Sequence, residues 1–314
     1  MFGKLKKTLR PCIYTFFFVP LQPNMDYKIA LYRVRTWLRH QLTAWNTGGE
    51  GVHSPYLFEW VRMVMSDKHS YYKWHEIENL RQGLLKDKRE LEFVDYGKKR
   101  TEDGEVKIDR RRVCDIARGS LARKDYAQML ARLVCWLGEK KAENGKQEGE
   151  GGLTIVELGT SFGITTSYLA AMDSRNRVVT FEGCPGVAEI AQANWAKLQL
   201  ENIECVVGNI RDLSLFDFRC ATEPIGQVGK KVDLFYIDAS HTYVSTRAFF
   251  NVGASMAHEK TVVVIDDIHH SPEMERAWTD ICADERVTST IDLYQMGLVF
   301  FDKHYWRRNY KMRL

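Results

Sequence analysis

The hydrophobic pattern changes character near the middle of the chain. Before residue 139, apolar residues recur at helical spacing in several stretches, which predicts helices. After residue 152, short β-branched runs alternate with helical stretches, an order typical of a parallel sheet covered on both faces. The predicted strands are Leu153–Leu158, Arg177–Phe181, Ile203–Val207, Val232–Ile237 and Thr261–Ile265.

The last part of the chain adds two more strands to this pattern. Ser289–Tyr294 and Leu298–Phe301 flank Gly297 and predict an antiparallel hairpin. The sequence therefore predicts an α/β fold. We expect a Rossmann-like, doubly wound, mostly parallel seven-stranded sheet with a C-terminal antiparallel hairpin, preceded by a helical N-terminal region.

The N-terminal region has recognisable helix starts. Residues 25–45 have a basic amphipathic pattern and predict one helix. Ser54 and Pro55 predict the start of another, because serine caps helices and proline fits their first turn. The alternative role for the adjoining His53 is in a lid over a binding site.

Residues 98–112 are mostly charged, so we expect an exposed loop there. Further helices are predicted over 72–86 and 121–137.

These patterns divide the chain into four expected segments. Met25 begins a fresh amphipathic pattern, so residues 1–24 are expected to be a non-native or disordered extension. Residues 25–138 form a helical cap region. Residues 139–152 are rich in Gly, Lys and Glu, lack a large apolar side chain, and are expected to be a linker. Residues 153–314 form the main domain.

A second interpretation of the first segment stays open. Basic residues at 4–7 precede an apolar stretch at 12–21, an order that resembles an export signal or a membrane-surface segment. The stretch is shorter than the ~20 residues that span a bilayer. We therefore expect no stable membrane span.

Composition excludes several classes of protein. The 314 residues are 45% hydrophobic and 27% charged, which is ordinary for a globular protein and excludes a disordered chain or a collagen-like fibre. The net charge is only +4, so the basic runs at 98–100, 110–112 and 307–313 are expected to be solvated faces rather than a nucleic-acid footprint. The 7 cysteines form no CxxC pair, which favours free thiols and a cytoplasmic location.

Candidate binding residues follow the predicted strands. The first strand ends in ELGTSFG, where Gly159 and Gly163 flank a turn that opens a helix. Glu182 ends the second strand and can accept hydrogen bonds from ribose hydroxyls. The turn lacks the dinucleotide pattern GxGxxG, and no GKS or GKT follows it, which excludes a phosphate-binding P-loop.

The segments ELGTSFGITTSYLA, TFEG and VDLFYIDASH resemble class I S-adenosylmethionine-dependent methyltransferases over roughly residues 150–302. The resemblance implies that S-adenosylmethionine binds at the ends of the first, second, third and fourth strands. Its methionine part would lie on the turn, its ribose on the second strand end, and its adenine against the third. The implied cofactor-binding residues are Glu157, Gly159, Thr160, Ser161, Gly163, Glu182, Gly183, Asn209 and Asp238.

A narrower resemblance concerns catalysis. Asp238, Asp266 and Asp267 end two neighbouring predicted strands, and three converging carboxylates repel one another unless protonated or bridged by a cation. Enzymes similar to catechol O-methyltransferase place Asp, Asp and Asn at these points, which implies a divalent metal such as Mg²⁺. The family analogue of His241 is often lysine, and a histidine there suits a general base. The alternatives are a helix-capping role for Asp267 and a metal-free role for Asp238.

Two further motifs, GVHSPYLF at 51–58 and IHHSPEMERAW at 268–278, resemble an uncharacterised bacterial branch of these enzymes. They extend the resemblance to most of residues 25–314. The expected function is O-methylation of a small-molecule acceptor, with Asp238 and His241 as catalytic residues. A homodimer is compatible with this interpretation. The alternatives are a nucleic-acid methyltransferase, although no NPPY or DPPY motif follows the fourth strand, and an inactive cofactor-binding scaffold.

Overall fold

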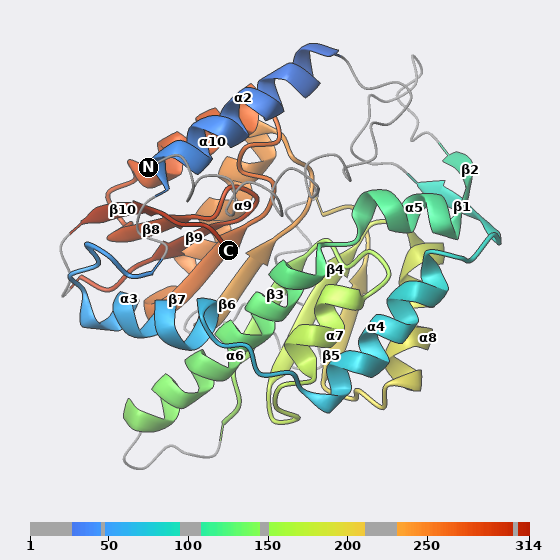
Figure 1. Ribbon diagram of the computed structural model, residues 1–314. Coiled ribbons are helices and arrows are strands. Elements are labelled where there is room, and N and C mark those ends of the chain that lie inside the picture. Colours follow the sequence, from blue (N-terminus) through green and yellow to red (C-terminus); the bar gives the residue numbers. More distant parts are fainter. Residues whose placement is uncertain (1–26, 45–47, 95–107, 145–150, 211–230, 304–306) are drawn as a thin grey trace, which may run out of the picture.

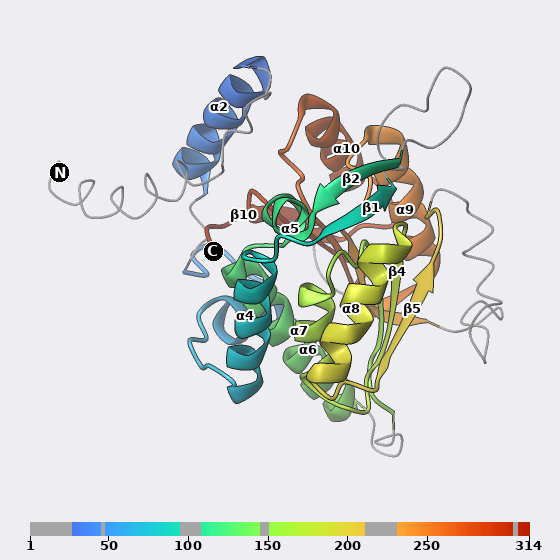
Figure 2. The same ribbon diagram turned by 90° about the vertical axis from the view of Figure 1, so that its right-hand side faces the viewer.

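The computed structural model describes residues 27–44, 48–94, 108–144, 151–210, 231–303 and 307–314 (Figures 1 and 2). Its centre is an eight-stranded sheet with the order β10-β8-β9-β7-β6-β3-β4-β5. Strands β3 to β7 are parallel, β9 is antiparallel to β7 and β8, and β10 is parallel to β8. The strands are β3 (Thr154–Leu158), β4 (Arg177–Glu182), β5 (Ile203–Val207), β6 (Val232–Ile237), β7 (Ala257–Ile265), β8 (Ser289–Asp292), β9 (Gly297–Phe300) and β10 (Arg308–Lys311).

The predicted α/β fold is confirmed, including the parallel strands and the C-terminal hairpin of β8 and β9. The expected number of seven strands is wrong, because β10 joins the sheet as an eighth strand beside β8. Strand β10 consists of polar residues around a single fully buried side chain, Tyr310. An edge strand of this kind has no continuous apolar run for sequence reasoning to detect.

Helices cover both faces of the sheet (Figure 1). The four that connect or follow strands are α7 (Ile164–Ala170), α8 (Pro185–Lys197), α9 (Tyr243–Ser255) and α10 (Pro272–Cys282). Phe249 and Phe250 of α9 and Trp278 of α10 pack with Val156 and Phe235 on one face. Both faces are apolar and buried, which explains why the central strands are unbroken hydrophobic runs.

The opposite face is covered by several of the N-terminal helices, which share a core with the sheet. Trp60, Leu130 and Leu133 lie in one buried cluster with Ile155 and Tyr236. The elements of this region are α2 (Tyr27–Thr43), α3 (Pro55–Trp60), the π-helix η1 (Val61–Met65), α4 (Tyr72–Leu84), α5 (Val113–Ser120) and α6 (Lys124–Asn144). Ser54 caps α3 by accepting a hydrogen bond from the Leu57 amide at 3.3 Å, as predicted.

Two local expectations in this region need correction. Helix α6 continues to Asn144, so residues 139–144 are helical rather than part of a linker, and residues 145–150 lie outside the described part. The expected loop at 98–112 contains strand β2 (Ile108–Arg112), which pairs with β1 (Glu90–Val94). Glu90 faces Arg112 and Glu92 faces Arg110, and such opposite charges stabilise a pair of strands that composition alone marks as a loop. Residues 98–107 and 1–24 lie outside the described residues.

Candidate functional site

The candidate site lies at the carboxyl ends of β3, β4, β6 and β7, which meet at one edge of the sheet because these strands are parallel. Gly159 follows β3 with φ +101°, and its amide donates to the Phe181 carbonyl oxygen at 3.0 Å. A Cβ atom on Gly159 would stand 2.1 Å from the carbonyl oxygen of Asp238. The turn after β3 and the end of β6 are therefore in backbone contact that only glycine permits.

The rest of the turn leads into helix α7. Ser161 has φ +49°, an uncommon conformation for a residue with a side chain. Gly163, with φ +74°, precedes the first residue of α7, and its carbonyl oxygen accepts a hydrogen bond from the Trp195 indole at 3.1 Å. Thr160 is buried, with its hydroxyl 2.6 Å from that of Thr180. Strained backbone conformations that are held by neighbours in this way are typical of ligand-binding turns.

Glu182, at the end of β4, binds backbone amides on both sides. Its Oε2 accepts from the Ser161 amide at 2.8 Å, and its Oε1 accepts from the Cys184 amide at 2.9 Å. Burial raises the pKa of Glu182, and these amides together with that of Gly183 oppose the rise. Both carboxylate oxygens retain lone pairs, so this fixed carboxylate can still accept hydrogen bonds from a diol.

Glu157 on β3 is fully buried and only half satisfied. Its Oε2 accepts hydrogen bonds from the Thr166 and Thr180 hydroxyls. Its Oε1 is buried without a hydrogen-bond partner. Burial raises the pKa of Glu157 to about 8. A buried acceptor of this kind would be completed by a donor, above all by a cationic one.

The carboxyl groups of Asp238 and Asp266 end β6 and β7 and form a hydrogen-bonded pair. Burial raises the pKa of Asp238 to about 6, and His241 opposes the rise. Burial and the two neighbouring carboxylates raise the pKa of Asp266 well above its ordinary value. The Tyr236 hydroxyl donates to the Asp238 Oδ2 atom at 3.1 Å.

Asp267 lies in a different environment, surrounded by cationic or basic side chains. Its backbone has φ +55°, and its Oδ2 atom is 3.2 Å from Nδ1 of His270. Burial opposes ionisation, but the hydrogen bond from His270 and the nearby His241 and Arg33 outweigh it and lower the pKa of Asp267. Asp267 is thus the most acidic of the three aspartates.

His241 lies between Asp238 and Asp267. Its Nε2 atom is 3.8 Å from Oδ1 of Asp238 and 4.0 Å from Oδ2 of Asp267. Its ring stacks on that of His270, with centroids 5.9 Å apart. Arg33 of α2 contacts the His270 ring and donates from Nε to the His270 carbonyl oxygen at 3.2 Å. The structure therefore brings His241 together with Asp238 and Asp267, and adds an arginine from the N-terminal helix.

This arrangement does not fit the expected Mg²⁺ site of Asp238, Asp266 and Asp267. Within the described residues, no group of three or more His, Cys, Asp or Glu side chains is placed to hold a metal ion. The carboxyl groups of Asp238 and Asp266 are hydrogen-bonded to each other, and His270, His241 and Arg33 lower the pKa of Asp267. Because Arg33 and two imidazole side chains already occupy the surroundings of Asp267, we derive no catalytic step through a metal.

Asn209 completes the set of predicted residues. It lies two positions after β5, and the amide of the preceding Gly208 donates to the Glu182 carbonyl oxygen at 2.9 Å. The turn after β5 therefore lies beside the end of β4. Contact between Asn209 and an adenine ring stays a prediction.

The sequence analysis did not identify three kinds of side chain that hydrogen-bond to residues of the site. Thr166 and Thr180 support Glu157, and Tyr236 supports Asp238. The position of Thr180, two residues before Glu182 on a buried strand, is a signal that could have identified it, because residues i and i+2 of a strand share a face. Arg33 carries no such signal, since 237 positions separate it from its partner His270.

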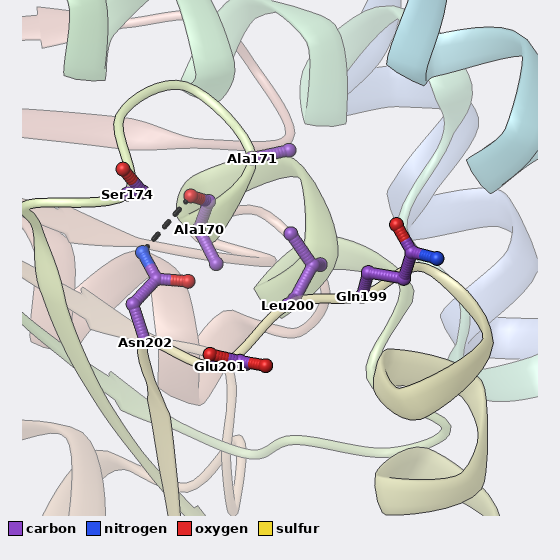
Figure 3. A pocket seen from close by; sticks show the side chains of 7 residues that line it. All are labelled: Ala170, Ala171, Ser174, Gln199, Leu200, Glu201 and Asn202. Carbon is purple, nitrogen blue, oxygen red and sulfur yellow. Dashed lines mark hydrogen bonds between the residues drawn. The ribbon is translucent and has the colours of Figure 1, made fainter.

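A hollow on the opposite edge of the sheet is not part of this site (Figure 3). It lies where α7 ends and β5 begins, at the amino end of the strands. Asn202 crosses it and donates from Nδ2 to the Ala170 carbonyl oxygen at 3.1 Å, which satisfies the end of α7. None of the predicted site residues lines this hollow.

Comparison with known proteins agrees with the predicted family. Residues 156–268 match the model of a family described as a methyltransferase domain. A search of curated proteins gives no match. This match confirms the domain type predicted from the sequence.

Several solved structures are similar at low identity. An O-methyltransferase from Bacillus cereus in complex with SAH is 17% identical, with 76% of this chain and 95% of that chain covered and a TM-score of 0.48. TomG, an O-methyltransferase from Streptomyces achromogenes in complex with SAM, is 18% identical, with coverages of 58% and 82% and a TM-score of 0.45. The methyltransferase PaMTH1 from Podospora anserina is 8% identical, with coverages of 79% and 96% and a TM-score of 0.49. The low sequence identities and TM-scores do not identify the acceptor molecule of this chain.

Among the described residues, no helix has the length and apolar character to cross a bilayer. The described cysteines, Cys114, Cys135, Cys184, Cys205 and Cys282, are all free thiols.

Proposed function

We propose that the protein is an S-adenosylmethionine-dependent methyltransferase that methylates a hydroxyl oxygen of a small-molecule acceptor, since residues 156–268 match the model of a methyltransferase domain. The observation that carries the proposal is the position of His241, between the carboxylates of Asp238 and Asp267 and at the same sheet edge as Glu157 and Glu182. A proton acceptor thus adjoins the expected cofactor-binding turn.

The residues present fit S-adenosylmethionine. The unpartnered Oε1 of Glu157 would accept a hydrogen bond from the cofactor's amino group, and the turn from Gly159 to Gly163 would accommodate its amino-acid end. Glu182, fixed by backbone amides, would bind the ribose hydroxyls. Asn209 would lie against the adenine. When bound, the cofactor supplies an electrophilic methyl group on sulfur.

The protein's own residues would then accept one proton from the acceptor and stabilise the positive charge that results. As the bound cofactor's methyl group passed to the acceptor oxygen, the His241 imidazole would accept the proton that the acceptor hydroxyl loses. Asp238 and Asp267 stabilise the imidazolium that results, because an opposite charge within about 4–6 Å favours the charged form of a side chain. The remaining contribution is positioning of the two reactants.

The surroundings of the basic segment favour a small molecule over nucleic acid. On β2, Arg110 is 3.9 Å from Glu92, Arg111 is 3.5 Å from Asp109, and Arg112 is 2.8 Å from Asp115. Carboxylates close to these arginines reduce the positive potential that a phosphate backbone would need.

We also propose that residues 153–314 are the methyltransferase domain, that the protein is cytoplasmic, and that it can form a homodimer. The free thiols support a reducing compartment. Sedimentation of the purified chain tests the dimer.

The test of the proposed reaction is formation of S-adenosylhomocysteine with a panel of hydroxylated aromatic acceptors. We expect turnover by the wild-type protein with at least one of them. The His241→Gln variant should lose roughly 10²–10⁴-fold in turnover, as expected for loss of a general base, and should still bind S-adenosylmethionine. Full turnover by this variant would contradict the role of His241, and methylation of nitrogen acceptors alone would contradict O-methylation.

A further inference from the structure

Helix α2 presents its polar side to the protein. Thr36 and His40 are its buried residues, and the His40 Nε2 atom lies 3.2 Å from Oδ1 of Asp292. Tyr32 donates to Glu275 of α10, and Arg39 forms an ion pair with the same carboxylate. These contacts attach α2 through hydrogen bonds and ion pairs rather than through an apolar core.

The opposite side of α2 carries a row of exposed apolar side chains, which we call the α2 stripe. Its members recur at intervals of three and four residues and therefore share one helix face. Leu31 is 68% exposed, Leu38 is 47% exposed and Leu42 is 84% exposed. The complete stripe is Tyr27, Leu31, Val34, Leu38 and Leu42. Figures 1 and 2 show α2 at the periphery of the molecule.

The charges of α2 identify a suitable partner. Its 17 residues include four Lys or Arg and no Asp or Glu. The exposed members Lys28, Arg35 and Arg39 recur at helical spacing and lie along one side of the stripe. An exposed apolar face bordered by cations is the pattern of helices that lie in the surface of an anionic bilayer.

The same charges disfavour two other occupants. Two copies of α2 packed through their stripes would bring like charges together. Residues 1–24 contain Lys4, Lys6, Lys7 and Arg10 and no acidic residue, so this segment would add positive charge beside α2.

We propose that α2 is a membrane-surface helix, which binds anionic phospholipid bilayers with the α2 stripe inserted at the boundary of headgroups and acyl chains. Arg35 and the part of Arg39 that stays exposed beside its ion pair with Glu275 bind the lipid phosphates. Helix α2 then lies in the bilayer surface and does not cross it, in agreement with its length and charge. Arg33 links α2 to His270 beside Asp267, so docking would hold the candidate site close to the bilayer.

The test is sedimentation of the full chain with vesicles of phosphatidylglycerol and phosphatidylcholine, compared with pure phosphatidylcholine. We expect binding to the anionic vesicles and at least about tenfold weaker binding to the neutral ones, since each cation near the surface contributes roughly fivefold. The double variant Leu31→Glu/Leu38→Glu should lower the partition coefficient at least about tenfold. The assay needs neither cofactor nor acceptor, so its outcome is separate from that of the proposed methyl transfer.

Matched control variants distinguish the loss of the α2 stripe from the added negative charge and from a folding defect. Tyr72→Glu/Ile108→Glu makes the same charge change at two other exposed apolar positions, 81% and 61% exposed, and should bind as the wild type does. Leu31→Ser/Leu38→Ser removes apolar surface without charge and should also weaken binding. Thermal unfolding should be unchanged in all variants, because the altered side chains are exposed.

Three results would overturn the proposal. Absence of binding to anionic vesicles by the wild type is the first. Binding that survives both α2 double variants is the second, since it would come from another part of the chain, residues 1–24 included. A wild-type dimer that dissociates when Leu31 and Leu38 are replaced, without any vesicle binding, is the third, because a second copy would then cover the stripe.

Discussion

The backbone amide of Ser161 donates to the carboxylate of Glu182 at 2.8 Å, across the ends of two neighbouring parallel strands. This bond joins the glycine turn after β3 to the acidic residue that ends β4. It holds Ser161 at a positive φ and fixes the Glu182 carboxylate in one orientation. The turn and the acid are therefore fixed relative to each other, which supports the proposal that they bind the cofactor's amino-acid end and its ribose.

The buried Glu157 makes a prediction about pH and stability. Its pKa is about 8 in the folded protein against about 4.3 in an unfolded chain, so unfolding releases a proton between these values. The free energy of unfolding of the wild type therefore falls as pH rises from about 4.5 to 8. Glu157→Gln, which mimics the protonated acid, should be more stable than wild type above pH 8 by on the order of 2–5 kcal/mol, and the difference should vanish near pH 4.5.

Denaturant unfolding at several pH values checks this difference, with Glu189→Gln on the exposed side of α8 as the control. The same Glu157→Gln variant should bind S-adenosylmethionine more weakly, because it loses a carboxylate partner for the amino group. A stability difference that does not change with pH would show that Glu157 is ionised in the folded protein.

Gly159 gives a prediction about the turn itself. In Gly159→Ala the new Cβ meets the Asp238 carbonyl at 2.1 Å, and a backbone atom cannot move aside as a flexible side chain can. At φ +101° alanine is strained as well. We expect a loss of about 3 kcal/mol or more in the free energy of unfolding. Gly138→Ala in α6, where no atom lies within 4 Å of the new Cβ, should instead stabilise the protein by about 0.5–1 kcal/mol. Equal effects in the two variants would contradict the described turn.

Asp292 on β8 gives a prediction about the attachment of α2. Its Oδ1 lies 3.2 Å from Nε2 of His40, and its Oδ2 lies 2.9 Å from Nε2 of His269. Burial opposes ionisation, yet these two histidines outweigh it and hold the pKa of Asp292 well below its ordinary value. The resulting stabilisation is present above the unfolded pKa of about 3.9 and is lost as pH falls through the lower folded value.

At pH 7, Asp292→Asn should lower the free energy of unfolding by roughly 2–4 kcal/mol and speed amide exchange in α2. The control is Asp125→Asn, where the exposed pair with Arg123 should contribute less than about 1 kcal/mol. Unchanged exchange in α2 would mean that Asp292 does not anchor this helix.

The charge balance around Asp267 predicts indifference to divalent cations. Because Arg33, His241 and His270 lower its pKa, Mg²⁺ would have to displace existing partners. Millimolar Mg²⁺ should leave the unfolding temperature unchanged, and a chelator should leave turnover unchanged. A rise of several degrees that disappears in Asp267→Asn would instead indicate a metal site at these aspartates.

The parallel strands and the binding turn could be predicted because their signals are local. Strand β6 is buried along its whole length and appears in the sequence as an unbroken apolar run. The turn is recognisable because the contact of Gly159 with Asp238 needs glycine, and Glu182 follows at the distance expected for the next strand.

The parts that escaped prediction depend on distant partners. Strand β2 forms because its arginines face Glu90 and Glu92, and β10 forms because Tyr310 enters the core beside β8. Arg33 reaches the site only through the packing of α2 against α10, which no local pattern encodes. The expected Mg²⁺ site stays a prediction, and it was inferred from the aspartates alone, without Arg33, His241 and His270, which lower the pKa of Asp267.

The most direct test of the central claim is calorimetric titration of the full chain with S-adenosylmethionine, in the wild type, Glu182→Ala and the surface control Glu189→Ala. The account predicts binding by the wild type and the control, and at least about tenfold weaker binding by Glu182→Ala, because it removes a carboxylate that accepts the ribose hydroxyls. Thermal unfolding confirms that each variant is folded. Binding of equal strength in all three would contradict the assigned cofactor site, and absence of binding by the wild type would contradict cofactor-dependent methyl transfer itself.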